Sequence, residues 1–314
     1  MNLMTLAYDF PSPLSLEDQH GLPCPEPLWR AETEEEWRRH LSASSVSNWP
    51  SAEAVVRRLG DSVLPTPSKI GMFACHVVIS TLLQKILLFR RSCPSADYGY
   101  LETRQRYIRA LKRWQHMWET EPESSLSPDH PRGPILFNCT AILRVAYVRL
   151  VADYAPVRYA FSFRSPLSGI EASIKQMDDP VRDGPTTRAA LQACLALRIP
   201  VHLGFEVVAR TSFWIWSVQH ALCYFECSLL LAQWLQIVEK ANDLSDDEAT
   251  ILSLARDLVL SSQSDELGGI EQPLAAGVLR NWARLLDTGD TTVWQIMPKM
   301  AHALRQHADS LAPM

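Results

Sequence analysis

The run from Phe213 to Val238 most constrains how this chain can fold. It is apolar enough to be mistaken for a membrane span, but Gln219, Glu226 and Gln233 recur in it every seven residues. These three side chains form one narrow polar stripe on a helix that is apolar elsewhere. A central glutamate is costly in lipid, so we predict a buried helix at the centre of a helical protein rather than a transmembrane one.

The composition favours the same fold class. Glycine accounts for 12 of 314 residues, roughly 4% against a usual share of about 7%, which favours long helices over turn-rich sheets. Apolar residues recur at helical spacing, as in Tyr107, Leu111, Trp114 and Trp118, and no segment alternates as a half-buried strand does. We therefore predict an all-α fold, arranged as a single large multi-helix domain.

Capping and breaking residues indicate where the helices begin and end. Thr33 and Glu36 have capping-box spacing, and Ser68 precedes an apolar run as a plausible N-cap. Asp246 and Thr291 are credible N-caps further along the chain. The Pro-rich link at 121–134 is interpreted as an exposed loop within the domain. Longer helices are predicted at residues 70–89, 97–118, 135–154, 187–198, 205–239, 246–261, 273–286 and 291–308.

Bulk charge and cysteine content narrow the function classes. A net charge of −5 and a pI of about 6.0 are not those of a self-sufficient nucleic-acid binder. The N-terminus has neither a basic n-region nor a long apolar h-region, so a secretory signal is not expected. Seven cysteines, mostly within apolar runs, indicate reduced, buried thiols in the cytosol or nucleus.

Two clusters have a chemical alternative beside a structural interpretation. Arg106, Arg109 and Arg113 share one helix face and could contact nucleic acid, but a solvated face beside an apolar one is favoured. His220, with Cys223 and Cys227, could offer ligands to zinc. A structural zinc site normally needs four ligands, and no fourth can be named, so packed thiols beside a histidine are favoured.

The acidic segment with Asp178, Asp179 and Asp183 superficially resembles the magnesium motifs of helical isoprenoid enzymes. Such motifs need carboxylates that face inward from a helix. Prolines and a glycine interrupt the segment, so these acids are interpreted as decorating a turn. A second acidic set is interpreted as a loop and the first turn of a helix; it comprises Asp243, Asp246, Asp247 and Glu248.

No standard catalytic motif is present in the sequence. A Gly-rich phosphate loop, a Gly-x-Ser-x-Gly elbow and a His-Glu-x-x-His pair are all missing from it. We therefore assign no catalytic residue and no metal ligand, and no cofactor-binding residue can be named. The chain is not expected to be an enzyme.

Several separate stretches resemble the regulatory domain of fungal-specific transcription factors, also called the middle homology region. Their order and spacing carry the resemblance, which extends from residue 8 to about residue 305. The stretches are Pro11–Asp18 with Leu22–Pro25, Leu28–Ala31 and Thr33–Arg38; Met72–Gln84; Gln219–Leu231; and Val293–Ala301. In this family the domain accompanies a zinc-finger or binuclear zinc-cluster module that binds DNA.

The resemblance implies that residues 8–314 are the C-terminal portion of such a regulatory domain, after an irregular end at residues 1–7. It implies a regulator of RNA polymerase II transcription that is located in the nucleus. Without the resemblance, a cytoplasmic location is expected, and secretion is not. Zinc and DNA would be bound by a separate module, because no cysteine or histidine cluster of zinc-module spacing occurs here. No cofactor is expected in this chain itself.

Proteins of the transcription machinery are the partners that the resemblance implies. A small-molecule effector and a second copy of the chain are further options, and no membrane partner is expected. Two alternatives stay open. One is a stand-alone helical interaction protein that has lost its DNA-binding half, and the other is a helical metal-dependent enzyme using Asp178, Asp179 and Asp183.

Overall fold

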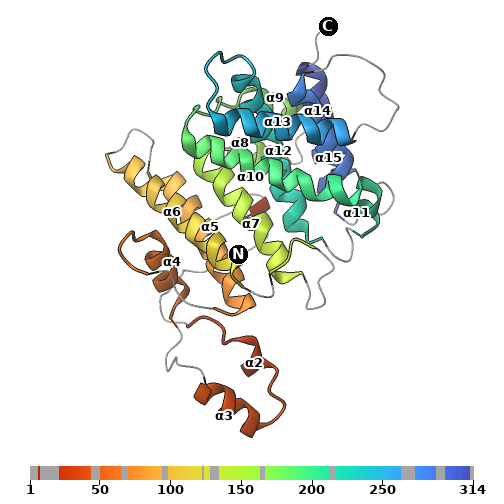
Figure 1. The fold of residues 1–314 in the computed structure, drawn as a ribbon. Coiled ribbons are helices and arrows are strands. Elements are labelled where there is room, and N and C mark those ends of the chain that lie inside the picture. Colours follow the sequence, from red (N-terminus) through yellow and green to blue (C-terminus); the bar gives the residue numbers. More distant parts are fainter. Residues whose placement is uncertain are drawn as a thin grey trace. The chain divides into compact units, whose positions relative to one another are not determined.

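The computed structural model describes residues 6–7, 21–43, 50–65, 70–93, 98–121, 124–127, 134–162, 167–211, 216–262, 273–287 and 294–311. In these ranges the regular elements are helices, and one isolated β-bridge joins Gly21 to Ser51 (Figure 1). The all-α prediction is confirmed. The chain divides into two compact units, one of residues 12–146 with Met1 and the other of residues 147–314 with residues 2–11. The assignment of residues 8–314 to one regulatory domain stays a prediction.

The first unit is built around three helices that pack on one another. Its core is formed by α4, α5 and α6, and two tryptophans of α6 fix it with hydrogen bonds. Trp114 donates its indole N–H to the Cys75 carbonyl at 3.1 Å, and Trp118 donates to the Leu136 carbonyl at 3.0 Å. The helices are α2 (Glu26–Trp29), α3 (Glu34–Ala43), α4 (Ala52–Gly60), α5 (Met72–Ser92), α6 (Tyr100–Glu119) and the part of α7 (Ile135–Val151) up to Ala146.

The basic face of α6 lies against the end of α4. Arg109 donates from Nη1 to the Gly60 carbonyl at 2.9 Å. Arg113 donates to four carbonyls, those of Arg58 at 2.9 Å, Leu59 at 3.5 Å, Asp61, and Leu64 at 2.5 Å. The last carbonyls of a helix have no partner inside it and carry its negative dipole end. Arg106 and Arg109 are exposed, as predicted for a solvated face, although Arg109 also donates to the end of α4. The prediction is wrong for Arg113, which is half-buried and holds the C-terminus of α4.

Replacing Arg113 by alanine is expected to lower the free energy of unfolding by about 2 kcal/mol, because charged donors are withdrawn from several carbonyls at once. Urea denaturation followed by circular dichroism measures the change. Arg39→Ala is the matched control, since Arg39 is an exposed residue of α3 in the same unit. Equal stability of the two variants would contradict the role given to Arg113.

The second unit surrounds one deeply buried helix, α12. It packs against α10 and α14, and α14 packs in turn against α13 and α15 (Figure 1). Helix α9 contacts both α8 and α15. The helices are α8 (Ala155–Ser162), α9 (Leu167–Lys175), α10 (Gly184–Leu203), α11 (Phe205–Thr211), α12 (Val218–Val238), α13 (Asp246–Ser262), α14 (Leu274–Leu286) and α15 (Ile296–Leu311).

The polar stripe predicted on this central helix holds a buried ionic cluster. Glu226 is 2% exposed, and its carboxylate accepts hydrogen bonds from Arg149 Nε at 2.9 Å and from Arg158 Nη1 at 3.1 Å. Seven residues further along the same face, Gln233 accepts a hydrogen bond from the Tyr154 hydroxyl at 2.8 Å. Burial alone raises the pKa of Glu226, but the two guanidinium groups outweigh it and hold that pKa below its ordinary value.

Two of the described helices, α5 and α12, are long and apolar enough to cross a membrane, and α7 with α8 would make a third if this pair, bent by 119°, were one span. Within the fold, 67% of the most apolar window of α5 and 89% of that of α12 are buried. Neighbouring helices of the same unit cover these residues, so core packing accounts for their hydropathy.

Several predicted boundaries differ from the observed ones. The helix predicted at 205–239 is divided into α11 and α12, and α10 extends beyond both predicted ends, with Pro200 inside it. Helices α2, α4, α8 and α9 were not predicted. Leu6 and Ala7, assigned to an irregular end, are helical and buried.

The predicted caps have different outcomes. Thr33 accepts a hydrogen bond from the Glu36 amide at 3.2 Å, which confirms it as a capping residue. Ser68 and Thr291 lie outside the described residues. Helix α5 begins at Met72 with Gly71 as its N-cap, and Gly71 has no side chain with which to cap.

Candidate functional site

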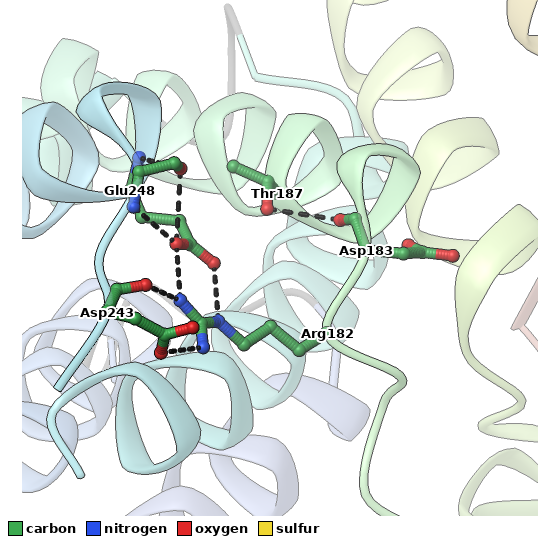
Figure 2. A network of polar contacts seen from close by, with 6 residues as sticks. Arg182, Asp183, Thr187, Asp243 and Glu248 are labelled. Atoms are coloured by element: carbon green, nitrogen blue, oxygen red, sulfur yellow. Dashed lines mark hydrogen bonds and ion pairs between the residues drawn. The ribbon is translucent and has the colours of Figure 1, made fainter. Parts of the chain in front are cut away.

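A cavity of about 430 Å³ lies between the first turns of α10 and α13 in the second unit. Leu191 and Ile251 supply apolar lining, and polar groups come from Thr187, Arg188 and Asp247. On each helix the lining residues are mostly three or four positions apart, so they lie on the one face that borders the cavity. Arg182 also lines the cavity and belongs to a network of polar contacts (Figure 2).

Arg182 is the centre of that network. Its Nε and Nη2 atoms each donate to one carboxylate oxygen of Glu248 at 2.8 Å, a two-point contact between planar groups. Its Nη1 donates to the Asp243 carboxylate at 2.8 Å, and its Nη2 donates to the Asp243 carbonyl at 2.5 Å. Arg182 therefore connects the segment before α10 to the segment before α13 (Figure 2).

Glu248 also closes a capping box with Ser245. The Ser245 amide donates to the Glu248 carboxylate at 2.9 Å, and the Glu248 amide donates to the Ser245 hydroxyl at 3.3 Å. The N-cap of α13 is thus Ser245, and the prediction of Asp246 is wrong by one residue. The spacing Ser-Asp-Asp-Glu is itself the sequence signal for this cap.

These contacts determine the acidity of the two carboxyl groups. The hydrogen bonds from Arg182 lower the pKa of Glu248 to about 2, although burial of the side chain opposes the shift. The same arginine lowers the pKa of Asp243. Both groups are therefore ionised in the folded protein at neutral pH.

The three acids of the metal-enzyme alternative do not converge. Asp183 is the N-cap of α10, where its Oδ1 accepts from the Thr186 amide at 2.9 Å and from the Thr186 hydroxyl at 2.7 Å. Asp178 and Asp179 are exposed. Among the described residues, no group of three His, Cys, Asp or Glu side chains has the spacing of a metal site. The arrangement gives this alternative no structural support.

His220, Cys223 and Cys227 are buried on α12. The His220 ring lies edge-on to the Trp216 ring at 5.2 Å, and its Nδ1 is 3.2 Å from the Tyr224 hydroxyl. The structure thus places the histidine in an aromatic part of the core, where it contributes to packing.

The second unit is a helical bundle in which polar groups hold helices and connecting segments together. Residues 153–306 match the family described as the fungal transcription factor C-terminal domain. Over these residues the match supports a fungal transcription factor regulatory domain, in agreement with the resemblance seen in the sequence. No curated protein and no solved structure match the chain.

Sequence reasoning missed the network around Arg182. The contact joins residues 66 positions apart, so no local pattern indicates it. The acids from Asp243 to Glu248 were interpreted as favouring a helix dipole, and this holds for Asp246 and Asp247 in the first turn of α13.

Replacing Glu248 by glutamine is expected to flatten the dependence of stability on pH in acid. The folded-state pKa of about 2 lies below the ordinary value of 4.5. The ionised carboxylate therefore stabilises the fold above pH 4.5, and this contribution is lost as the pH falls from 4.5 towards 2. Urea denaturation at a series of pH values measures it.

Asp247→Asn is the matched control, because Asp247 is exposed in the same turn and does not take part in the network. The wild-type protein and this control should lose stability more steeply than Glu248→Gln below pH 4.5. Parallel curves for all three proteins would refute the ion pair as a source of stability.

Proposed function

We propose that this chain is the regulatory part of a nuclear, zinc-finger-type transcription factor that acts on RNA polymerase II genes. The match of residues 153–306 to the fungal transcription factor C-terminal domain carries the proposal. That range includes α10, α12 and α13, and therefore Glu226 with Arg158 of the buried cluster and the cavity beside Arg182, while Arg149 lies just before it. In this proposal zinc and DNA are bound by a separate module that these residues do not contain.

The division of labour has physical support. The chain carries a net charge of −5, which opposes close approach to a polyanion. Arg113, which could have met phosphate groups, is half-buried and donates to carbonyls at and after the end of α4. In this proposal the chain regulates transcription by contacting other proteins. A small effector that binds between α10 and α13 would control those contacts.

Fused to a heterologous DNA-binding module, the chain is expected to change transcription from a matching reporter in a fungal cell. The change is measured against the module alone. A Glu226→Ala fusion at equal expression tests whether the effect requires an intact core. This substitution leaves Arg149 and Arg158 buried without their carboxylate, so the regulatory effect should be lost with the fold.

Two results would overturn this proposal. The first is a folded, well-expressed fusion that leaves the reporter at the level of the module alone. The second is a salt-resistant, sequence-specific gel shift by residues 1–314 without any added module, which would place DNA binding inside this chain.

Filling the cavity is expected to reduce the reporter response without unfolding the chain. Leu191→Trp places an indole between α10 and α13, whereas Leu203→Trp places the same ring at the exposed end of α10. Melting temperatures of the two variants check that both fold. If both fusions regulate as well as the wild type, the cavity has no part in the response.

A further inference from the structure

The cavity between α10 and α13 is lined by some charges that are already paired. Arg182 lies in the lining, and its guanidinium is 2.8 Å from the carboxylates of both Glu248 and Asp243 (Figure 2). Asp183, also in the lining, accepts a hydrogen bond from the Thr186 amide at 2.9 Å as the N-cap of α10. These groups hold the two helices and their caps in place, so they are engaged before any ligand arrives.

Two other charged residues of the lining stand apart from that network. Within the described parts of the chain, the side chains of Arg188 in the second turn of α10 and Asp247 in the first turn of α13 form no hydrogen bond and no ion pair. The charge of Arg188 acts on Tyr147, but burial raises the pKa of that phenol to about 12, so the phenol is neutral at pH 7. The cavity therefore offers one uncompensated cation and one uncompensated anion, each from a different helix.

The helix N-termini at the cavity do not by themselves make an anion site. Amides in the first turn of a helix often bind an anion, but here the Thr186 amide is bound by Asp183 and the Glu248 amide by Ser245. A ligand carboxylate would instead use the planar fork of donors on Arg188, which is half-buried.

The balance of charge in the lining decides what kind of ligand fits. The acids Asp183, Asp247 and Glu248 outnumber the bases Arg182 and Arg188. A phosphate ester or another ligand with several negative charges is therefore disfavoured, because like charges repel. A simple cation would leave Arg188 without a partner, and a simple anion would leave Asp247 without one. A ligand with one carboxylate and one ammonium group satisfies both and adds no net charge.

The size and the apolar part of the cavity define the rest of the ligand. Leu191 of α10 and Ile251 of α13 supply apolar surface in the same lining. The volume of about 430 Å³ lies towards the lower end of the range of pockets that bind small molecules, roughly 300–1,000 Å³. The cavity therefore suits a small molecule with an apolar body rather than a nucleotide or a long peptide.

We propose that this cavity is an effector site for a small zwitterion with an apolar side chain, an α-amino acid of the leucine or phenylalanine type. Its carboxylate binds Arg188, its ammonium group binds Asp247, and its side chain packs on Leu191 and Ile251. The inference names the ligand class for the effector input of the function proposed above, and it rests on that proposal.

Titration calorimetry of the full chain tests the site with L-leucine and L-phenylalanine as the probes. Each is compared with the acid that lacks its amino group and with the amine that lacks its carboxyl group. At least one amino acid should bind, and its amine should bind about tenfold more weakly because the charged hydrogen bonds to Arg188 are lost. Its acid should bind about threefold more weakly, since Asp247 is exposed and an exposed ion pair contributes less.

Two variants assign the two contacts. Arg188→Gln should weaken the amino acid about tenfold and leave its amine unchanged, because the amine has no carboxylate to lose. Asp247→Asn should weaken the amino acid about threefold and leave its acid unchanged. Arg198→Gln is the matched control, because Arg198 is an exposed residue of α10 outside the cavity lining. If a variant does not fold, the comparison of the analogues on the wild-type chain still decides.

Three results would overturn the inference. They are no binding of either amino acid at millimolar concentration, binding of the acid or of inorganic phosphate as tight as that of the amino acid, and affinities of the two variants equal to that of Arg198→Gln. Amino-acid binding without a reporter response would contradict the proposed function and support the site. A reporter response without amino-acid binding would overturn this inference alone.

Discussion

The organisation of the second unit depends on one buried carboxylate. Glu226 lies in the middle of α12, the helix that the rest of the unit encloses, and a charge in that position is tolerable only when it is paired and hydrogen-bonded. Arg149 at the end of α7 and Arg158 in α8 supply that pairing. The need to neutralise Glu226 therefore places the α7–α8 corner against α12 and fixes which face of that helix meets the corner.

Arginine serves a second purpose in the described parts of the molecule, as a donor to backbone carbonyls. Arg113 binds carbonyls at and after the end of α4, Arg149 binds that of Leu6, and Arg182 binds that of Asp243. A planar group with five donors suits this work better than a lysine does. It also explains why a basic helix face in an acidic chain need not be a surface for nucleic acid.

The sequence predicted what depends on periodicity and missed what depends on distant pairing. The seven-residue spacing of Glu226 and Gln233 predicted a polar stripe on a buried helix, and the Thr33 cap followed from local spacing. The Ser245 cap was equally readable but was assigned one residue late. Arg182 and Glu248 meet across 66 residues, and Leu6 and Arg149 across 143. A single sequence holds no local signal for such partners, because tertiary packing chooses them.

The Glu226 cluster also sets an order of events during synthesis. Arg149 and Arg158 leave the ribosome 77 and 68 residues before Glu226. Until then neither cation has the carboxylate that makes its burial tolerable, so α7 and α8 must wait in a hydrated form. The second unit can therefore close only after α12 has emerged. Translation past that helix is the earliest point at which this cluster can form, and α14, which packs on α12, has still to follow.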